Sequence, residues 1–137
     1  MVKLKVWAKV GPTESKEKVS KALLSLFPKN LVSDDKNVLS IEIDHNELDY
    51  FREVMRIKKI EKTVFKQLLK FEKDDHTRLM FNKQAAFMGK FIVVDTYDLS
   101  PMGAIVLEID GFNDDFLRWF TGLERDPESK FYHQSNP

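Results

Sequence analysis

The sequence predicts an α+β fold, in which helices pack on one face of a mostly antiparallel sheet of about five strands. The chain of 137 residues suits one hydrophobic core, and no tandem repeat or long linker divides it. Strand and helix periodicities follow one another in the order strand, helix, strand, helical segment, three strands, helix. We therefore expect a single domain over residues 1–123, and a loosely ordered polar tail over residues 124–137.

The first elements are a strand and a helix. Apolar residues alternate over residues 2–10 with lysines and a tryptophan, which is typical of a strand buried on one face. A Gly-Pro sequence ends this strand, and Thr13 is the predicted N-cap of a helix whose apolar residues recur at helical spacing as far as Phe27. Pro28 ends that helix, and a polar loop containing Asp34 and Asp35 follows.

The middle of the chain predicts a second strand and a long helical segment. Residues 39–44 alternate as a half-buried strand. Asp44 and Glu47 then have the spacing of a capping box, which predicts that a helix begins here. The helical pattern continues over residues 46–73 without glycine or proline, so it fits either one helix or two helices joined by a bend near residues 56–59.

Three strands and a helix complete the predicted fold. The strands are expected at residues 77–81, 90–94 and 104–109, with a turn over residues 97–103 between the last two. Asn113 is the predicted cap of a final helix that buries Phe116 and its neighbours and ends at Gly122.

Composition excludes several classes of protein. With 42% hydrophobic and 32% charged residues, the chain has the balance of a folded domain, and no run of about 18 apolar residues could span a bilayer. The N-terminus alternates where a signal peptide would have an apolar block, so we expect a cytoplasmic protein without a membrane or export segment. The absence of cysteine excludes disulfides, thiolate catalysis and cysteine-based zinc sites.

The charges are balanced in number but unevenly distributed. The chain has 22 basic and 22 acidic residues. Residues 52–73 hold eight basic and three acidic residues, whereas residues 107–128 hold two basic and seven acidic residues. These patches could face different partners, or each other across a homodimer, and the sequence leaves both open.

The first candidate site is a row of basic residues in the helical segment. In one continuous helix, seven of them would lie within about 60° of one line, away from the acidic residues. Such a row could follow an RNA phosphate backbone. The alternative is a solvated outer face, as on many surface helices. The row consists of Arg52, Arg56, Lys59, Lys62, Lys66, Lys70 and Lys73.

The second candidate site is the outward face of the first strand, with Lys3, Lys5, Trp7 and Lys9. An aromatic ring among lysines on an open sheet could stack on a base while the ammonium groups hold phosphates. The alternative is that Trp7 packs under another segment and that the lysines pair with acids on neighbouring strands, such as Glu42.

The third candidate site is the segment of residues 81–90, whose order of residues fits neither a helix nor a strand. Lys83 and Gln84 could offer a cation and an amide to phosphates or base edges, beside small residues that allow close approach. The alternative is structural, with Phe81 and Phe87 in the core and Gln84 bonded to buried backbone groups.

Catalytic groupings are poorly represented. The three histidines are scattered, and the sequence Asp-Asp-His at residues 74–76 fits a solvated helix end better than a metal cluster. Phosphate-binding glycine loops and a nucleophile elbow are absent. No catalytic residue, metal or cofactor is therefore predicted.

Four segments together resemble uncharacterised protein family 0201, an archaeal group of small proteins for which RNA binding is predicted. They are VKLKVWAKVGPTE at residues 2–14, the arginines Arg52 and Arg56, NKQAAFMGK at residues 82–90 and SPMGAI at residues 100–105. The resemblance covers residues 2–120. It implies a fold like that of the large-subunit ribosomal protein that carries five-S RNA, and a role near RNA processing.

Two segments depart from the pattern of the family. Residues 60–66 read IEKTVFK where the family tends to read Ile-Leu-Asp-Thr-Ala-Arg, so lysines replace an arginine. Residues 119–122 read WFTG where the family has Trp-Leu-Ala-Pro. The chain is therefore expected to be a divergent member.

Together these observations predict a non-enzymatic module that binds RNA or associates with a ribonucleoprotein. In this hypothesis Lys62, Lys66 and Lys70 hold phosphates, and Trp7 offers a stacking surface. Lys83 and Gln84 make a more local contact. Two alternatives stay open: a homodimeric structural protein whose basic and acidic patches meet, and a small-molecule or nucleotide-processing enzyme that uses acids such as Asp95 or Asp98.

Overall fold

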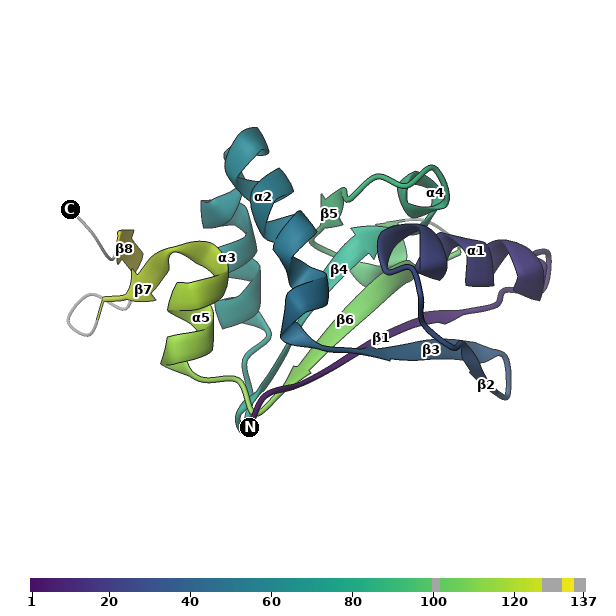
Figure 1. The fold of residues 1–137 in the computed structure, drawn as a ribbon, viewed down its shortest axis with the longest axis horizontal. Coiled ribbons are helices and arrows are strands. Elements are labelled where there is room, and N and C mark those ends of the chain that lie inside the picture. Colours follow the sequence, from purple (N-terminus) through teal and green to yellow (C-terminus); the bar gives the residue numbers. More distant parts are fainter. Residues whose placement is uncertain (100–101, 127–131, 135–137) are drawn as a thin grey trace.

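An antiparallel sheet of six strands forms the centre of the fold (Figure 1). The structure is a computed structural model, and it describes residues 1–99, 102–126 and 132–134. The strands lie in the order β2 (Ser33–Asp35), β3 (Val38–Ile43), β1 (Lys3–Lys9), β6 (Ala104–Asp110), β4 (His76–Asn82) and β5 (Val93–Val94). The α+β class is confirmed, with one strand more than the sequence predicts. The likeness to the ribosomal-protein fold stays a prediction.

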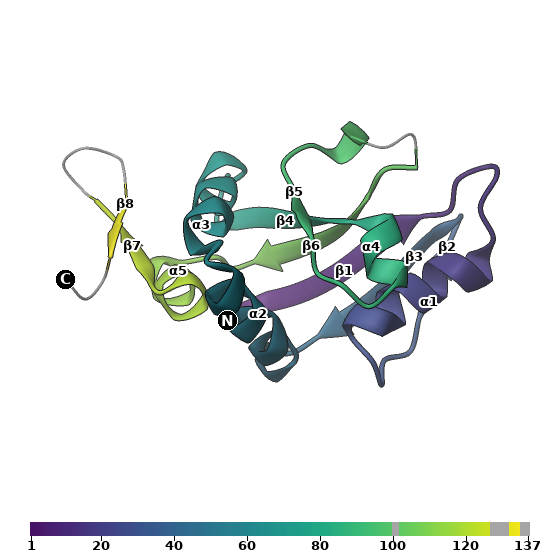
Figure 2. The ribbon, with the colours of Figure 1, turned by 90° about the horizontal axis from the view of Figure 1, so that it is seen from above.

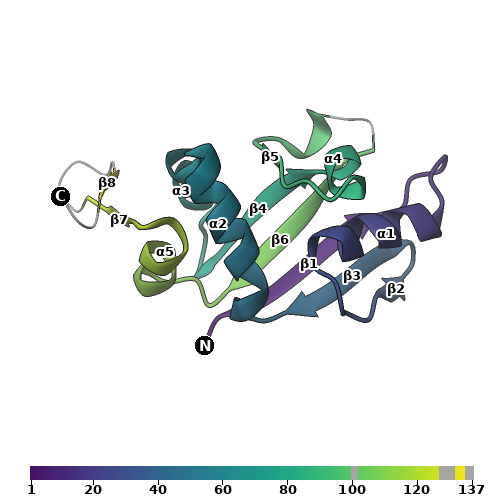
Figure 3. The same ribbon diagram turned by 45° about the horizontal axis from the view of Figure 1, so that its top comes forward.

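Helices pack against one face of this sheet, in two groups. Helix α1 (Lys16–Leu26) and the short α4 (Lys83–Phe87) lie near one end of the molecule, whereas α2 (Asp49–Lys58), α3 (Glu61–Lys70) and α5 (Asp114–Thr121) lie near the other (Figures 1, 2 and 3). Two 3-10 turns, η1 (His45–Leu48) and η2 (Tyr97–Leu99), complete the helical elements. Within the described ranges, no helix has the length and apolar character that crossing a membrane requires.

The core follows from the alternation of the strands. Leu4, Val6 and Ala8 of β1 point toward the helices and are buried, while the residues between them point to the other face. At the centre of the core, the ring of Phe51 on α2 lies 5.2 Å from that of Phe81 on β4. A smaller cluster covers part of the other face, where Met80, Val94, Ala104 and Val106 are buried beneath Trp7, Phe71 and Tyr97.

The α2–α3 junction decides the question of one helix or two. Lys59 adopts a left-handed conformation with φ 57°, and its N–H donates to the carbonyl groups of Arg56 and Met55. The N–H of Ile60 also donates to the carbonyl of Met55, at 3.1 Å, so the chain closes α2 as in a Schellman-type cap before α3 begins. The basic row is therefore divided between two helices that run in different directions (Figure 3).

Lys59 occupies a backbone conformation that favours glycine, which gives a direct test of this junction. We expect Lys59→Gly to raise the free energy of unfolding by about 0.5–1 kcal/mol, because glycine has no Cβ to strain the left-handed region. Chemical denaturation with fluorescence detection measures the change. A loss of stability would show that the lysine side chain holds the junction, contrary to this expectation.

Four local predictions are wrong. The N-cap of α1 is Ser15, whose hydroxyl accepts from the N–H of Lys18 at 3.1 Å, and not Thr13. The predicted polar loop contains β2, because left-handed backbone at residues 36 and 37 closes a hairpin with β3. The segment of residues 81–90 holds α4, whose N-cap is Asn82. Strand β5 is shorter than residues 90–94, because only Val93 and Val94 pair with β4.

The other predicted helix ends are confirmed. Asp44 and Glu47 form the capping box, which here starts the 3-10 turn η1 that leads into α2. Asn113 caps α5, and Gly122 ends it with φ 75°. In the predicted tail, β7 (Leu123–Arg125) pairs with β8 (Tyr132–Gln134), while residues 127–131 and 135–137 lie outside the described part of the chain.

Candidate nucleic-acid interface

A groove lined by basic residues lies where α2, the start of α3 and α5 meet. It has a volume of about 830 Å³. Five cationic side chains line it, with Glu61 as the one carboxylate among its described lining residues. We call it the basic groove, and its cations are Arg52, Arg56, Lys59, Lys62 and Arg118.

Helical spacing places the α2 residues in the groove. Phe51 and Met55 are buried in the core, so the residues that follow each of them, Arg52 and Arg56, lie on the flank of α2. The bend at Lys59 then brings the start of α3 to the same groove, where Lys62 lies in its first turn. The bend therefore gathers cations that a straight helix would have spread along its length.

Helix α5 forms the opposite wall of the groove and fixes one of its cations. The guanidinium of Arg52 stacks over the ring of Trp119 at 4.2 Å, and it also contacts Asp49 at 3.5 Å. Arg118 bonds to Asp115 at 2.8 Å. These contacts hold two planar, permanently charged groups in place at the groove, which suits recognition of phosphate oxygens.

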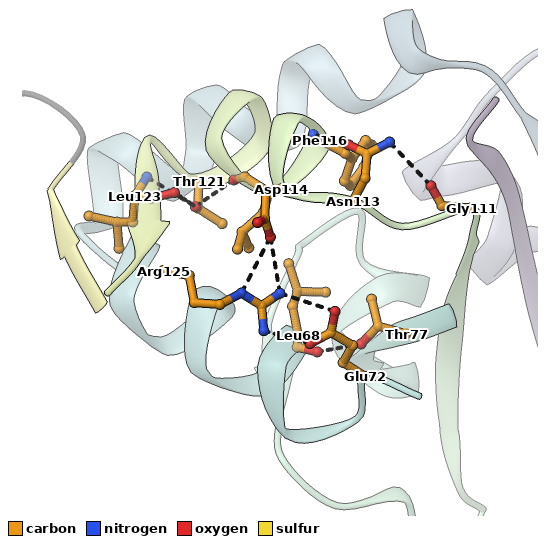
Figure 4. A network of polar contacts seen from close by, with 11 residues as sticks. Leu68, Glu72, Thr77, Gly111, Asn113, Asp114, Phe116, Thr121, Leu123 and Arg125 are labelled. Carbon is orange, nitrogen blue, oxygen red and sulfur yellow. Dashed lines mark hydrogen bonds and ion pairs between the residues drawn. The ribbon is translucent and has the colours of Figure 1, made fainter. Parts of the chain in front are cut away.

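An arginine of β7 joins the segment that follows α3 to the start of α5 (Figure 4). Arg125 of β7 bonds to both carboxylate oxygens of Glu72, at 2.9 and 3.0 Å, and to Asp114 at 3.1 Å. The bond to Glu72 is the main reason that the pKa of Arg125 is raised above its usual value, and Asp114 adds to the effect. Two residues of the predicted acidic patch thus pair with arginines of the same chain, Asp114 with Arg125 and Asp115 with Arg118.

The rest of the basic row continues on α3. Lys66 and Lys70 are exposed on this helix, four and eight residues after Lys62. A rise of about 1.5 Å per residue places Lys62 and Lys70 roughly 12 Å apart along the helix axis. The Nζ atom of Lys70 also lies 5.3 Å from the centre of the Phe71 ring.

The outward face of β1 has a different electrostatic character. Trp7 packs 5.9 Å from Tyr97 in the smaller cluster, and is only partly exposed. Lys5 lies directly opposite Glu42 on β3 and Glu108 on β6. A cavity of about 620 Å³ next to these lysines is lined by Lys3, Lys5, two histidines and four carboxylates, those of Glu42, Asp44, Glu108 and Asp110. The four carboxylates outnumber the two lysines, which makes this cavity a poor site for phosphate.

Tyr97 covers part of this face, and its side chain is partly buried. Burial raises its pKa above the usual 10.0, and the negative charges of Asp98 and Glu14 act in the same direction. Asp95 and Asp98, the acids of the enzyme alternative, are both exposed in this region. Across the described residues, no group of three or more His, Cys, Asp or Glu side chains is placed to hold a metal ion.

The structure separates Lys83 from Gln84. Lys83 is only 6% exposed, and its Nζ donates to the carbonyl oxygens of Lys9 and Met102, at 2.8 and 2.7 Å, and to Glu14 at 3.0 Å. All three N–H donors of this ammonium are therefore used inside the protein, which leaves none for a phosphate. Gln84, by contrast, is exposed on α4.

Another glutamine has the structural role that the sequence suggested for Gln84. Gln67 of α3 is buried, accepts from the N–H of Met80 at 2.9 Å and donates to the carbonyl of Val94 at 2.8 Å. It therefore satisfies backbone groups of β4 and β5.

Sequence reasoning missed the α5 wall of the groove. The sequence predicts neither Arg118 nor Trp119 as a site residue, because Arg118 lies in an acidic stretch and Trp119 lies beside the apolar residues of the final helix. The signal in the sequence is an arginine followed directly by a tryptophan. Only the packing of α5 beside α2 brings these two residues to the basic row.

The fold and the groove together define an α+β protein with a basic surface of the kind that nucleic-acid-binding proteins use. A family model described as RNA binding matches residues 3–110, which extend from β1 to the end of β6. The α2 and α3 walls of the groove lie within this match, and α5 lies outside it.

Relatives identify the family. A UPF0201 protein of Methanothermobacter thermautotrophicus is 33% identical over 117 residues, which cover 85% of this chain and 86% of that protein. A UPF0201 protein of Metallosphaera sedula is 31% identical over 113 residues, or 80% and 79% of the two chains. The crystal structure of the UPF0201 protein from Methanococcus jannaschii matches with a TM-score of 0.64 at 25% identity, covering 87% of this chain and 92% of that one. The chain belongs to the UPF0201 family, as its resemblance predicted.

Proposed function

We propose that this protein binds RNA through the basic groove, and that it does so by contacts to the phosphate backbone. The observation that carries the proposal is the lining of the groove, where five cations converge around one carboxylate. A concave site whose lining has an excess of one sign of charge attracts a ligand of the opposite sign, and here the cations outnumber the one lining carboxylate although Arg52 and Arg118 also contact Asp49 and Asp115. The match to a family model described as RNA binding supports a nucleic acid as that ligand.

The two aromatic residues that line the groove, Trp119 and the buried Phe120, favour contact with the RNA backbone over contact with the bases. One face of Trp119 is covered by the Arg52 guanidinium, and the ring also contacts Phe116 and Phe120. Base stacking requires an open ring face. The groove therefore offers charge and guanidinium groups, which hold RNA in register without reading its sequence.

The groove is preferred over the other two candidate surfaces on grounds of charge. Lys3 and Lys5 share their cavity with four carboxylates, and the ammonium of Lys83 is used within the protein. The proposed RNA-binding surface also includes Lys66 and Lys70, because these exposed lysines continue the basic surface along α3 beyond Lys62.

Salt dependence of binding tests this proposal. We expect the triple variant Arg56→Gln, Lys59→Gly, Lys62→Gln to bind an oligouridylate more weakly. The slope of log K against log salt should fall by about 2, since each lost phosphate contact on a single strand removes about 0.7. Glycine at residue 59 removes the charge while it keeps the left-handed backbone. Fluorescence anisotropy over a series of salt concentrations measures both effects.

A matched control separates the groove from net charge. The triple variant Lys29→Gln, Lys36→Gly, Lys90→Gln removes the same charge from exposed lysines outside the groove, and Lys36 also has a left-handed backbone, with φ 51°. For this control variant, the slope of log K against log salt should stay near that of the unchanged protein. Equal loss in the two triple variants, or no salt-dependent binding by the unchanged protein, would contradict the proposal.

A further inference from the structure

A second cavity lies between α1 and α4, at the other end of the molecule from the basic groove (Figures 1 and 3). Its volume is about 530 Å³, within the range of about 300–1,000 Å³ that small-ligand sites have. Most of its wall is apolar, with Val19 and Ala22 from α1, Phe87 and Met88 from α4, and Met102. We call it the α1–α4 pocket. Such walls suit a flat, uncharged ring system.

The polar residues that line this pocket come from two segments, residues 13–18 and residues 83–84. Glu14 lines it with a side chain that is 10% exposed. One carboxylate oxygen, Oε1, accepts from the N–H of Gly11 at 2.8 Å and from Lys83 at 3.0 Å. No described residue donates a hydrogen bond to the other oxygen, Oε2. The pocket therefore has an acceptor that is fixed in place and still available.

The amide of Gln84 lines the same pocket from α4. Its side chain is exposed and makes no hydrogen bond to a described residue. An amide of this kind can bond to adenine in a bidentate manner, by accepting from the N6 amino group and donating to N7. The second hydrogen of the N6 amino group then needs an acceptor, and Oε2 of Glu14 is one.

We propose that the α1–α4 pocket binds an adenine base, with Gln84 and Glu14 on its polar edge and the methionine and phenylalanine side chains against its ring. In this arrangement Lys83 is a positioning residue, because it holds the Glu14 carboxylate by Oε1 and neutralises its charge. Lys18, which also lines the pocket, is the cation available to a phosphate on the attached ribose. If the adenine belongs to RNA, this inference rests on the proposed function, since the base would then be part of the strand that the basic groove binds.

Nucleosides test the pocket without the groove, because they carry no phosphate. In calorimetric titrations of the full chain we expect adenosine to bind, and inosine and uridine to bind at least tenfold more weakly. Inosine places a carbonyl oxygen where adenosine has its amino group, and that oxygen would face the Glu14 carboxylate. We expect Gln84→Leu to weaken adenosine binding by about tenfold or more, the loss of one bidentate pair.

Controls locate the effect in the pocket. Asn46→Leu replaces another exposed amide, on η1, and should leave adenosine affinity unchanged. Circular dichroism melting shows whether Gln84→Leu remains folded. In ¹H–¹⁵N correlation spectra, adenosine should shift the amide signals of Ala85 and Ala86, and not those of Trp119. No adenosine binding, equal affinity for inosine, or an unchanged affinity in Gln84→Leu would overturn the inference.

Oligonucleotides distinguish the two sources of the base. If the adenine belongs to RNA, oligoadenylate binds more tightly than oligouridylate of equal length, with the same salt slope. If it belongs to a free nucleotide, adenosine binds while the two oligonucleotides bind equally. If the proposed function is wrong and the pocket is right, the protein binds adenosine but shows no salt-dependent binding of oligouridylate.

Discussion

Replacement of Lys83 by methionine is expected to lower the free energy of unfolding by about 3–5 kcal/mol, the typical cost of breaking a buried ion pair from one side. Methionine keeps most of the volume, but it leaves the Glu14 carboxylate largely buried without its cation. It also leaves the carbonyl groups of Lys9 and Met102 without their donor. The melting temperature should fall by roughly 10–20 °C.

Two further variants show whether the ion pair is the cause. Adding Glu14→Gln to Lys83→Met should recover part of the loss, because the uncompensated negative charge is then absent. Lys90→Met changes an exposed lysine of the same segment, and should alter stability by less than about 0.5 kcal/mol. If the losses from Lys83→Met and Glu14→Gln simply add in the double variant, the two side chains do not act as a pair.

Replacement of Phe51 by alanine should cost a similar amount, about 3–5 kcal/mol, by opening a cavity in the core. Phe51 is fully buried, and its ring lies 5.2 Å from that of Phe81 on β4 and 5.8 Å from that of Phe120 on α5. It therefore connects α2 to both β4 and α5. Urea denaturation measures the loss, and RNA binding measured at a temperature where the variant is folded should also weaken, because α2 and α5 form the two walls of the basic groove.

The neighbouring residue provides the control. Tyr50 is 63% exposed on the same helix, so Tyr50→Ala should change stability far less than Phe51→Ala. Phe51→Leu, which keeps more of the volume, should cost about 1.5 kcal/mol or less. A Phe51→Ala variant as stable as Tyr50→Ala would mean that the aromatic cluster does not hold the helices together.

Much of the fold could be predicted from the sequence, because its signals are local. The alternation in β1, the capping side chains of Asp44 and Asn113 and the left-handed backbone of Gly122 all act within a few residues. Strand β2 was not predictable in this way. Its residues are polar and exposed, and it exists because left-handed backbone in the turn that follows it allows pairing with β3.

The candidate site was less predictable, because it depends on where helices meet. The sequence placed Arg52, Arg56, Lys59 and Lys62 in one basic row, and the structure brings these four to one groove. It could not show that Lys59 itself makes the bend, because lysine is not a residue that usually adopts this conformation.

The role of Lys83 illustrates the same limit. A lysine in a polar motif is normally solvated, and only the approach of the chain at residues 9, 14 and 102 supplies the oxygens that surround its ammonium. These three partners are 74, 69 and 19 residues away in the sequence, so no local pattern could reveal them.

The two edges of the central sheet are its shortest strands, with three residues in β2 and two in β5. The outer edge of β2 carries Asp34 and Asp35, both exposed, and Lys16 lies 2.7 Å from Asp34. Short, charged edges disfavour the addition of a strand from another molecule. The outermost strands thus protect the sheet from edge-to-edge aggregation, by their short length at both edges and by charge at β2.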